Sequence, residues 1–311
     1  MSVNGSQEVS FDFTAMNVTT TQAGTTGSTD EAFAEQFMQV KADMLSMLVG
    51  SATDNGNNVS TSDTGGQGSS TDPFGGLTGL SASGYNMSLR DPQSAYNMMS
   101  TINTDEVDFK AQYADLSQMG AAVQGMQQDG SALGGINSST SNSDIESALQ
   151  KFIKEYNDWI KQFSGDMQQG GLLSGTQAAQ ESVYELQQNI SSLFNGAGSG
   201  VQGMGDLGLT IDPKTGMASL DTSKLEAVLA SNKTGAVAAI DQFSGNFAKS
   251  AQLLNESDNF IPSQLSNLNN AISYITSNLS SLQAEFGMGD PANPSPAVSQ
   301  ALATYNSMMK S

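Results

Sequence analysis

Apolar residues recur along this chain at spacings of three and four, which is the rhythm of amphipathic helices that pack through a narrow seam. The clearest stripe runs over residues 145–163 and consists of Ile145, Leu149, Phe152, Tyr156, Trp159 and Phe163. Ile153 and Ile160 lie beside this stripe and widen it. We therefore expect this helix to pack against more than one neighbour.

Four further stripes predict helices over residues 30–49, 94–126, 179–193 and 265–286. A Gly-rich turn at 170–175 separates the stripes at 145–163 and 179–193, so these two are expected to form an antiparallel helical hairpin. Twelve residues are candidates for packing helices together, within one chain or between copies: Phe109, Tyr113, Leu116, Phe152, Tyr156, Trp159, Leu186, Ile190, Leu268, Ile272, Ile275 and Leu279.

Short polar signals predict where these helices begin and end. Ser143 with Glu146, and Ser174 with Gln177, have the spacing of a capping box at a helix start. Glycine marks the expected ends at Gly165 and Gly287. Residues 129–142 are expected to be a break, residues 237–247 carry a further short apolar stripe, and the last long helix is expected to follow Pro262 and Ser263.

Residues 206–221 predict a small β-hairpin between the helices. Leu207, Leu209 and Ile211 alternate with polar or small residues, as strand residues do. The turn residues follow directly: Pro213 after Asp212 presets one turn position, and Gly216 can take the left-handed one.

The expected fold is mainly α: an elongated antiparallel helical or coiled-coil bundle with a small β-hairpin, flanked by disordered polar segments. The expected organisation is a disordered tail (1–28), an N-terminal helix (29–50), a Gly/Ser/Thr-rich linker (51–93), a helical domain (94–287), and a Pro-rich connector with a short C-terminal helix (288–311).

Composition narrows the possible functions. The net charge is −20, and a chain this acidic is not expected to bind nucleic acid or anionic lipid, because both need basic surface. The chain contains neither Cys nor His, so we expect no catalytic, cofactor or metal site and no enzyme activity. No basic and apolar signal peptide opens the chain, and no run of about 20 apolar residues predicts insertion into a membrane.

These features occur in an order that resembles the C-terminal region of the flagellar hook-associated protein 2 family, the filament-capping proteins. The similarity rests on residues 152–157 (FIKEYN), 171–175 (GLLSG), 207–212 (LGLTID), Gly216, 220–225 (LDTSKL) and Phe243. The helix around residues 109–113 (FKAQY) resembles the N-terminal coiled-coil helix of that family. The large β-rich insertion usual in the family is missing, and residues 130–142 bridge its place, which indicates a minimal form.

The resemblance implies a structural protein at the tip of the bacterial flagellum that forms a ring-like homo-oligomer and helps flagellin assemble. It also implies export through the flagellar type III apparatus to an extracellular location, with flagellin, hook–filament junction proteins and an export chaperone as partners. The alternative that the residues leave open is a type III-exported surface adhesin or effector built on the same helical scaffold.

Overall fold

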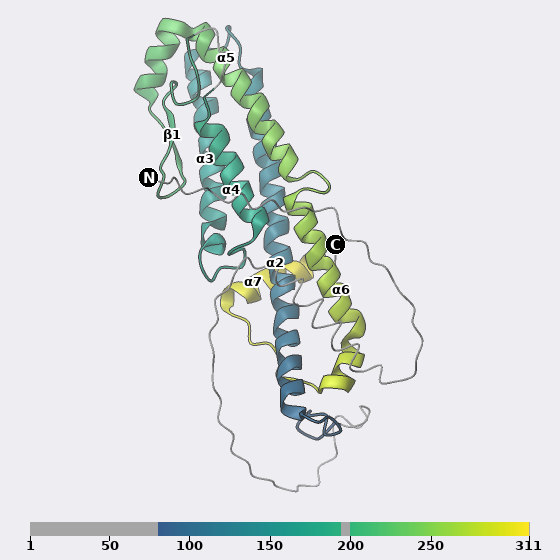
Figure 1. Cartoon of the computed structure of the whole chain (residues 1–311). Coiled ribbons are helices and arrows are strands. Elements are labelled where there is room, and N and C mark those ends of the chain that lie inside the picture. The colour runs from purple at the N-terminus through teal and green to yellow at the C-terminus, as the bar shows by residue number, and fades with distance from the viewer. Residues whose placement is uncertain (1–79, 194–199, 311) are drawn as a thin grey trace, which may run out of the picture. The chain divides into compact units, whose positions relative to one another are not determined.

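The computed structural model describes residues 80–193 and 200–310, and its helices confirm the mainly α fold (Figure 1). The elements are α2 (Pro92–Ala132), the 3-10 turn η1 (Leu133–Gly135), α3 (Asn142–Met167), α4 (Gln177–Ser191), β1 (Leu209–Ile211), β2 (Ala218–Leu220), α5 (Thr222–Leu254), α6 (Phe260–Phe286) and α7 (Pro296–Met308). The tail expected at 1–28, the helix at 29–50 and most of the linker at 51–93 lie outside the described residues.

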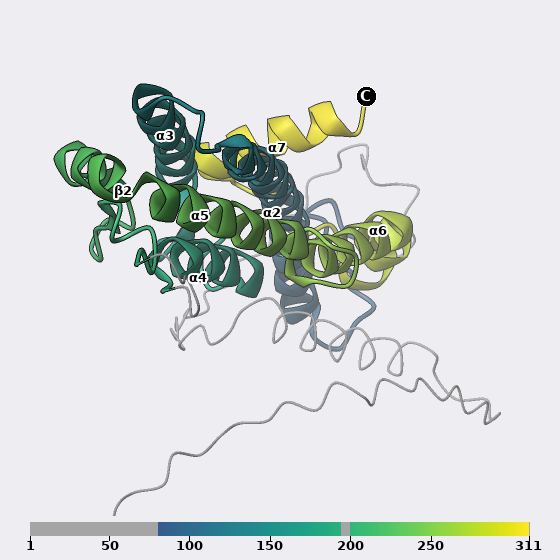
Figure 2. The same cartoon turned by 90° about the horizontal axis from the view of Figure 1, so that it is seen from above.

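Helix α2, 41 residues long, is the element that most others contact. It packs against α3, α5, α6 and α7, and in Figure 2 it lies among α5, α6 and α7. The hydroxyl of Ser244 on α5 donates to the carbonyl of Gly130 on α2, and the hydroxyl of Thr276 on α6 donates to the carboxylate of Glu106 on α2. Because positions on α2 fall as positions on α5 and α6 rise, these two helices run antiparallel to α2.

Helix α3 contributes the apolar stripe at the centre of the main core. All six stripe residues and the two flanking isoleucines are buried, and α3 packs against α2, α5 and β2, as the widened stripe predicts. The ring of Phe152 meets Phe243 and Phe247 of α5 edge-on, with centroids 5.3 and 4.8 Å apart. Edge-on aromatic pairs add specificity to the burial of apolar area.

Helix α4 does not pack mainly against α3, as the expected antiparallel hairpin requires. It packs against α5, α6 and β1, so the two helices share one core with the rest of the molecule. The turn between them closes through backbone hydrogen bonds, including Leu173 N–H to the carbonyl of Asp166 at 2.8 Å. Tertiary burial by α5 supplies the partner surface that a two-helix hairpin lacks.

Several expected helix boundaries are wrong by a few residues. The side chain of Ser141 caps α3 by accepting from the N–H of Asp144, so Ser143 lies inside the helix. Thr176 precedes α4 without a side-chain cap, and α3 continues past Gly165 to Met167. At the start of α3, the bond that Ser141 accepts from the N–H of Asp144 takes the place of the capping box expected from Ser143 and Glu146.

The interruptions expected within the helical part are also partly wrong. The stripe at 237–247 belongs to α5, which a kink divides at Asn232, where φ is −150° and ψ is 60°. The stripe therefore lies on the helical segment that follows the kink. Helix α6 begins at Phe260 behind Asn259, before Pro262, and ends at Gly287 as expected. Proline at the third position of a helix costs no hydrogen bond, because the first-turn N–H groups have no partner within the helix.

Helix α2 extends to Ala132, into the break expected at 129–142, because Gly130 permits close packing. A Cβ atom at Gly130 would lie 2.7 Å from a ring carbon of Phe247. The carbonyl of Gly130 also accepts a 2.7 Å hydrogen bond from the hydroxyl of Ser244, which is buried. The glycine that indicated a break is therefore the point where α2 and α5 approach most tightly.

Residues 80–91, at the end of the expected linker 51–93, fold into turns that fasten α2 to the end of α6. The buried side chain of Asn86 donates to the carbonyls of Ala284 and Glu285 at 2.8 and 3.1 Å. Carbonyls in the last turn of a helix have no partner within the helix, and these bonds satisfy two of them. The N–H of Met288 donates to the carbonyl of Gly84 at 2.8 Å, which completes the junction.

Within the part of the chain that the structure describes, no helix is both long and apolar enough to cross a membrane.

Truncating the central aromatic should cost far more stability than truncating an exposed one. Phe152→Ala is expected to lower the free energy of unfolding by about 3–5 kcal/mol, because it removes a buried ring and leaves a cavity. Urea unfolding followed by circular dichroism measures the change. The matched control is Tyr184→Ala on α4, where the side chain is 60% exposed and an effect within about 0.5 kcal/mol is expected. Equal losses in both variants would contradict the central place of Phe152.

Candidate functional site

All twelve predicted packing residues are buried or half-buried within one copy of the chain. Phe109, Tyr113 and Leu279 are half-buried. The other nine are buried: Leu116, Phe152, Tyr156, Trp159, Leu186, Ile190, Leu268, Ile272 and Ile275. Their partners are other helices of the same copy, so any role of these residues between copies stays a prediction.

The β-hairpin is fixed on α3 by one asparagine side chain. The amide of Asn157 donates to the carbonyl of Ala218 at 2.8 Å and accepts from the N–H of the same residue at 2.7 Å. These are the two bonds that a neighbouring strand would supply to the outer edge of β2. Asn157 therefore takes the place of a third strand and joins the hairpin to the helix.

Tyr156, the residue before Asn157, holds the turn of the hairpin. Its hydroxyl donates to the carbonyl of Gly216 at 2.8 Å, and its ring is fully buried. Burial raises the pKa of Tyr156 to about 12, so the hydroxyl keeps its proton at every physiological pH. The hydroxyl can therefore act as the donor to the turn throughout this pH range.

The hairpin turn has the geometry that its residues predict. Asp212 and Pro213 are exposed, and the Asp212 side chain accepts from the N–H of Lys214 at 2.7 Å. Gly216 has a φ of 70°, in the left-handed region that favours glycine. A Cβ atom there would meet the side-chain nitrogen of Gln187 on α4 at 2.7 Å, so the turn lies against both α3 and α4.

The strands pair antiparallel, with Leu209 opposite Leu220, Thr210 opposite Ser219, and Ile211 opposite Ala218. Leu209 and Ala218 face the core and are buried, whereas Thr210 and Ser219 are exposed. Alternation of this kind is typical of a two-stranded sheet with one face on a hydrophobic core. The hairpin is thus a fixed part of the molecule and not a free arm.

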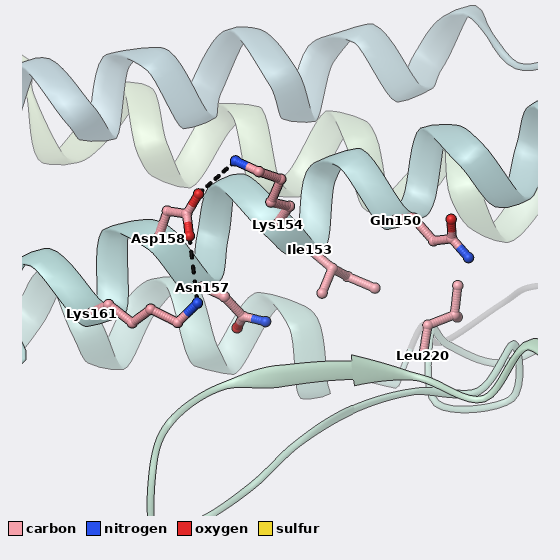
Figure 3. A pocket seen from close by; sticks show the side chains of 7 residues that line it. All are labelled: Gln150, Ile153, Lys154, Asn157, Asp158, Lys161 and Leu220. Carbon is pink, nitrogen blue, oxygen red and sulfur yellow. Dashed lines mark hydrogen bonds and ion pairs between the residues drawn. The ribbon is translucent and has the colours of Figure 1, made fainter.

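An open cavity of about 360 Å³ lies beside the joint between α3 and the hairpin. Its lining residues are Gln150, Ile153, Lys154, Asn157, Asp158, Lys161 and Leu220 (Figure 3). Asp158 pairs with Lys154 at 2.6 Å and with Lys161 at 3.5 Å, and the hydrogen bond from Lys154 lowers the pKa of Asp158. The rim is therefore mixed in charge, and its exposed ion pairs add little stability.

A second polar cluster lies between α2 and the C-terminal end of α3. The carboxyl groups of Asp115 and Asp166 face each other there, and one oxygen of Asp115 is buried without a hydrogen-bond partner. Burial, with the neighbouring Asp166 carboxyl, raises the pKa of Asp115 to about 6, and burial also raises the pKa of Asp166. The hydrogen bond with Asp115 opposes the rise in the pKa of Asp166, so the pair favours a protonated Asp115 that donates to Asp166.

Nothing in this geometry resembles a catalytic centre or a metal site. Across the described residues, no group of three or more Asp or Glu side chains is arranged to hold a metal ion. The joint combines a permanent Tyr156 hydroxyl contact with a paired amide, and neither group has a neighbouring base to activate it. What the site does chemically is to set the position of the hairpin relative to the helices.

Sequence reasoning missed Asn157 as a site residue, although it is the last residue of the segment 152–157 that carried the family resemblance. Asn157 lies next to the apolar stripe, and periodicity treats such a position as solvent-facing. Asp115 was missed in the same way. The partner of Asn157, the backbone of Ala218, lies 61 residues further along the chain, where local periodicity gives no signal.

Removing the amide of Asn157 should loosen the hairpin specifically. Asn157→Ala is expected to cost about 1–3 kcal/mol, because the N–H and C=O of Ala218 lose their partners in a partly buried place. Hydrogen exchange should show faster exchange at the Ala218 amide. The control Asn246→Ala changes an exposed asparagine on α5 and should leave both measurements unchanged. Unaltered protection at Ala218 in Asn157→Ala would refute the joint.

The carboxyl pair should give stability an unusual pH dependence. Because the folded-state pKa of Asp115 is raised from 3.8 to about 6, its stabilising contribution is present below 3.8 and is lost as the pH rises through 6. Asp115→Asn should therefore be more stable than the wild type at neutral pH, and the difference should shrink toward acid pH. Urea unfolding over a pH series measures this. Glu226→Gln, which changes an exposed carboxyl on α5, should show no such trend. A wild type with a higher free energy of unfolding than Asp115→Asn at neutral pH would contradict the raised pKa of Asp115.

Comparison with known proteins agrees with this arrangement. Residues 135–287 match the family model described as flagellar hook-associated protein 2 C-terminus. The match covers α3, α4, the hairpin, α5 and α6, which are the elements that form and surround the joint. None of the curated proteins and none of the solved structures matches the chain significantly. Residues 135–287 are therefore similar to the C-terminal region of the flagellar hook-associated protein 2 family.

Proposed function

We propose that this protein is a component of the flagellar filament cap, which oligomerises at the filament tip and promotes the assembly of flagellin. The observation that carries the proposal is the family match over the helices and the hairpin that α3 holds. The partners proposed are further copies of this chain, flagellin and the proteins of the hook–filament junction.

The surface of the helical part supports a role in reversible protein contacts. A groove of about 600 Å³ lies between α2, the end of α5 and the start of α6, and amide side chains line much of it: Gln124, Gln127, Gln252 and Asn255. Amides can hydrogen-bond a protein partner without sealing a large apolar area. A cap has to bind and release incoming subunits repeatedly, and contacts of this polarity suit that cycle.

The fold also supports a scaffold whose parts keep their relative positions. Polar side chains fasten separate helices through backbone carbonyls, as Asn255 of the α5–α6 turn does with Gly120 of α2 at 2.8 Å. Such bonds have well-defined geometry and are costly to break when they are partly buried. A protein that guides the folding of others needs a surface of fixed shape.

The proposed route to the filament tip is the flagellar type III apparatus, with an export chaperone as a transient partner and an extracellular end point. The family match supports this route. The absence of cysteine from the sequence is compatible with passage as an unfolded chain, since no disulfide has to form on arrival.

Deletion of the gene should produce short or absent filaments, with flagellin monomer accumulating in the culture medium. Electron microscopy of cells and immunoblots of the medium measure the two effects. Complementation with the wild-type gene should restore filaments. Loss of filaments without extracellular flagellin would indicate an export defect instead, and normal filaments in the deletion strain would overturn the proposal.

A further inference from the structure

The C-terminal helix α7 forms a packing unit separate from the main core. Its buried residues are Ala301 and Tyr305. Tyr305 packs with Ala114 of α2 and Ile272 of α6 in a small cluster that is distinct from the large core formed by α2 to α6. No residue of α7 belongs to the cluster that forms the main core, so this core packs without α7.

Side chains of α2 and α6 form the surface on which α7 packs. The ring of Tyr113 meets Tyr305 edge-on with centroids 5.7 Å apart, and Phe109 and Met308 pack around the same cluster. We name this surface, formed by Phe109, Tyr113, Ala114 and Ile272, the α7 seat. Any copy of this chain carries both the helix and the seat, so the fit within one copy is also a fit between two copies.

Packing around the first turn of α7 leaves space. An open cavity of about 560 Å³ separates Ser295, Ala297 and Val298 from the residues at the end of α3, and Gln112 and Gln168 line it. The side-chain oxygen of Gln112 is buried without a hydrogen-bond partner. An unsatisfied buried acceptor next to a cavity costs free energy, so the contact between α7 and the rest of the copy is not optimised.

The connector before α7 is held to α2 by hydrogen bonds at its first residues. It is fixed to α2 as far as Asp290, whose N–H donates to the Ser100 hydroxyl at 2.7 Å and whose carbonyl accepts from Asn103 at 2.9 Å. Residues 291–295 then contain two prolines, and Pro296 opens the helix. Proline favours extended backbone, and five extended residues span roughly 16 Å.

We propose that α7 exchanges between copies, so that α7 of one copy occupies the α7 seat of its neighbour. The exchange keeps every contact in the seat and changes only the path of residues 291–295, which makes it an inexpensive route to association. When each copy donates α7 to the next, the contact is head-to-tail, and such contacts close into a ring when the rotation between copies permits. This inference rests on the proposed cap function, because it names the surface through which copies meet.

Cross-linking on the full chain tests the exchange, and the absence of native cysteine keeps the background clean. Ala297→Cys and Gln168→Cys replace exposed residues that line the same cavity, one at the start of α7 and one after α3. The double variant should cross-link with a short bis-maleimide, which shows that the two sites are within reach. The two single variants, mixed and incubated before the reagent is added, should yield a cross-linked dimer only when α7 of one copy lies in the seat of the other.

The expected result is a covalent dimer from this mixture that increases with protein concentration. The matched control mixes Ala297→Cys with Gln242→Cys, an exposed position on α5 outside this cavity, and should yield none. Adding Tyr305→Ala to the Ala297→Cys copy should reduce the dimer several-fold, because it removes the main anchor in the seat.

Two results would overturn the exchange: no dimer from the mixture while the double variant cross-links within one chain, or equal dimer in the control mixture. Failure of the exchange is distinguishable from failure of the proposed function. Short filaments with flagellin in the medium of the deletion strain, together with no dimer in the mixture, would leave the cap function standing and remove only α7 exchange.

Discussion

The packing of α3 against α2 and α5 is the interaction on which the other features of the described chain depend. Phe152 contacts both Phe243 and Phe247, and Gly130 lets Phe247 approach α2 as closely as backbone allows. The hairpin in turn reaches its position only because α3 presents Tyr156 and Asn157 on the face beside the stripe.

Polar side chains that bind distant backbone groups determine how the elements are arranged around this core. Asn157 fastens the hairpin, Asn86 fastens the end of α6, Asn255 joins the α5–α6 turn to α2, and Ser244 joins α5 to α2. Apolar seams alone tolerate small shifts along a helix, whereas a hydrogen bond to one carbonyl specifies a single register. The high content of Asn and Ser in this chain thus has a structural use within the fold.

The C-terminal helix α7 packs apart from the main core. The main core joins five helices and the hairpin in one apolar cluster, but α7 contacts its surroundings through a small cluster around Tyr305. Helix α7 has two buried residues, Ala301 and Tyr305, and a proline-containing connector precedes it. For a protein that is proposed to assemble at a filament tip, a stable body with one exchangeable helix separates the folding of a copy from its association with others.

The sequence by itself determined the helices, the hairpin and the family resemblance, because these depend on local periodicity, turn chemistry and short ordered motifs. The stripe at 145–163 and the left-handed Gly216 are found where periodicity and turn rules predict them. Only the tertiary structure decided that Gly130 continues α2 and that Asn157 and Asp115 meet partners from distant segments. The physical reason is that each of these depends on a partner far along the chain, such as Phe247, Ala218 or Asp166, and local patterns carry no information about which distant residues come together.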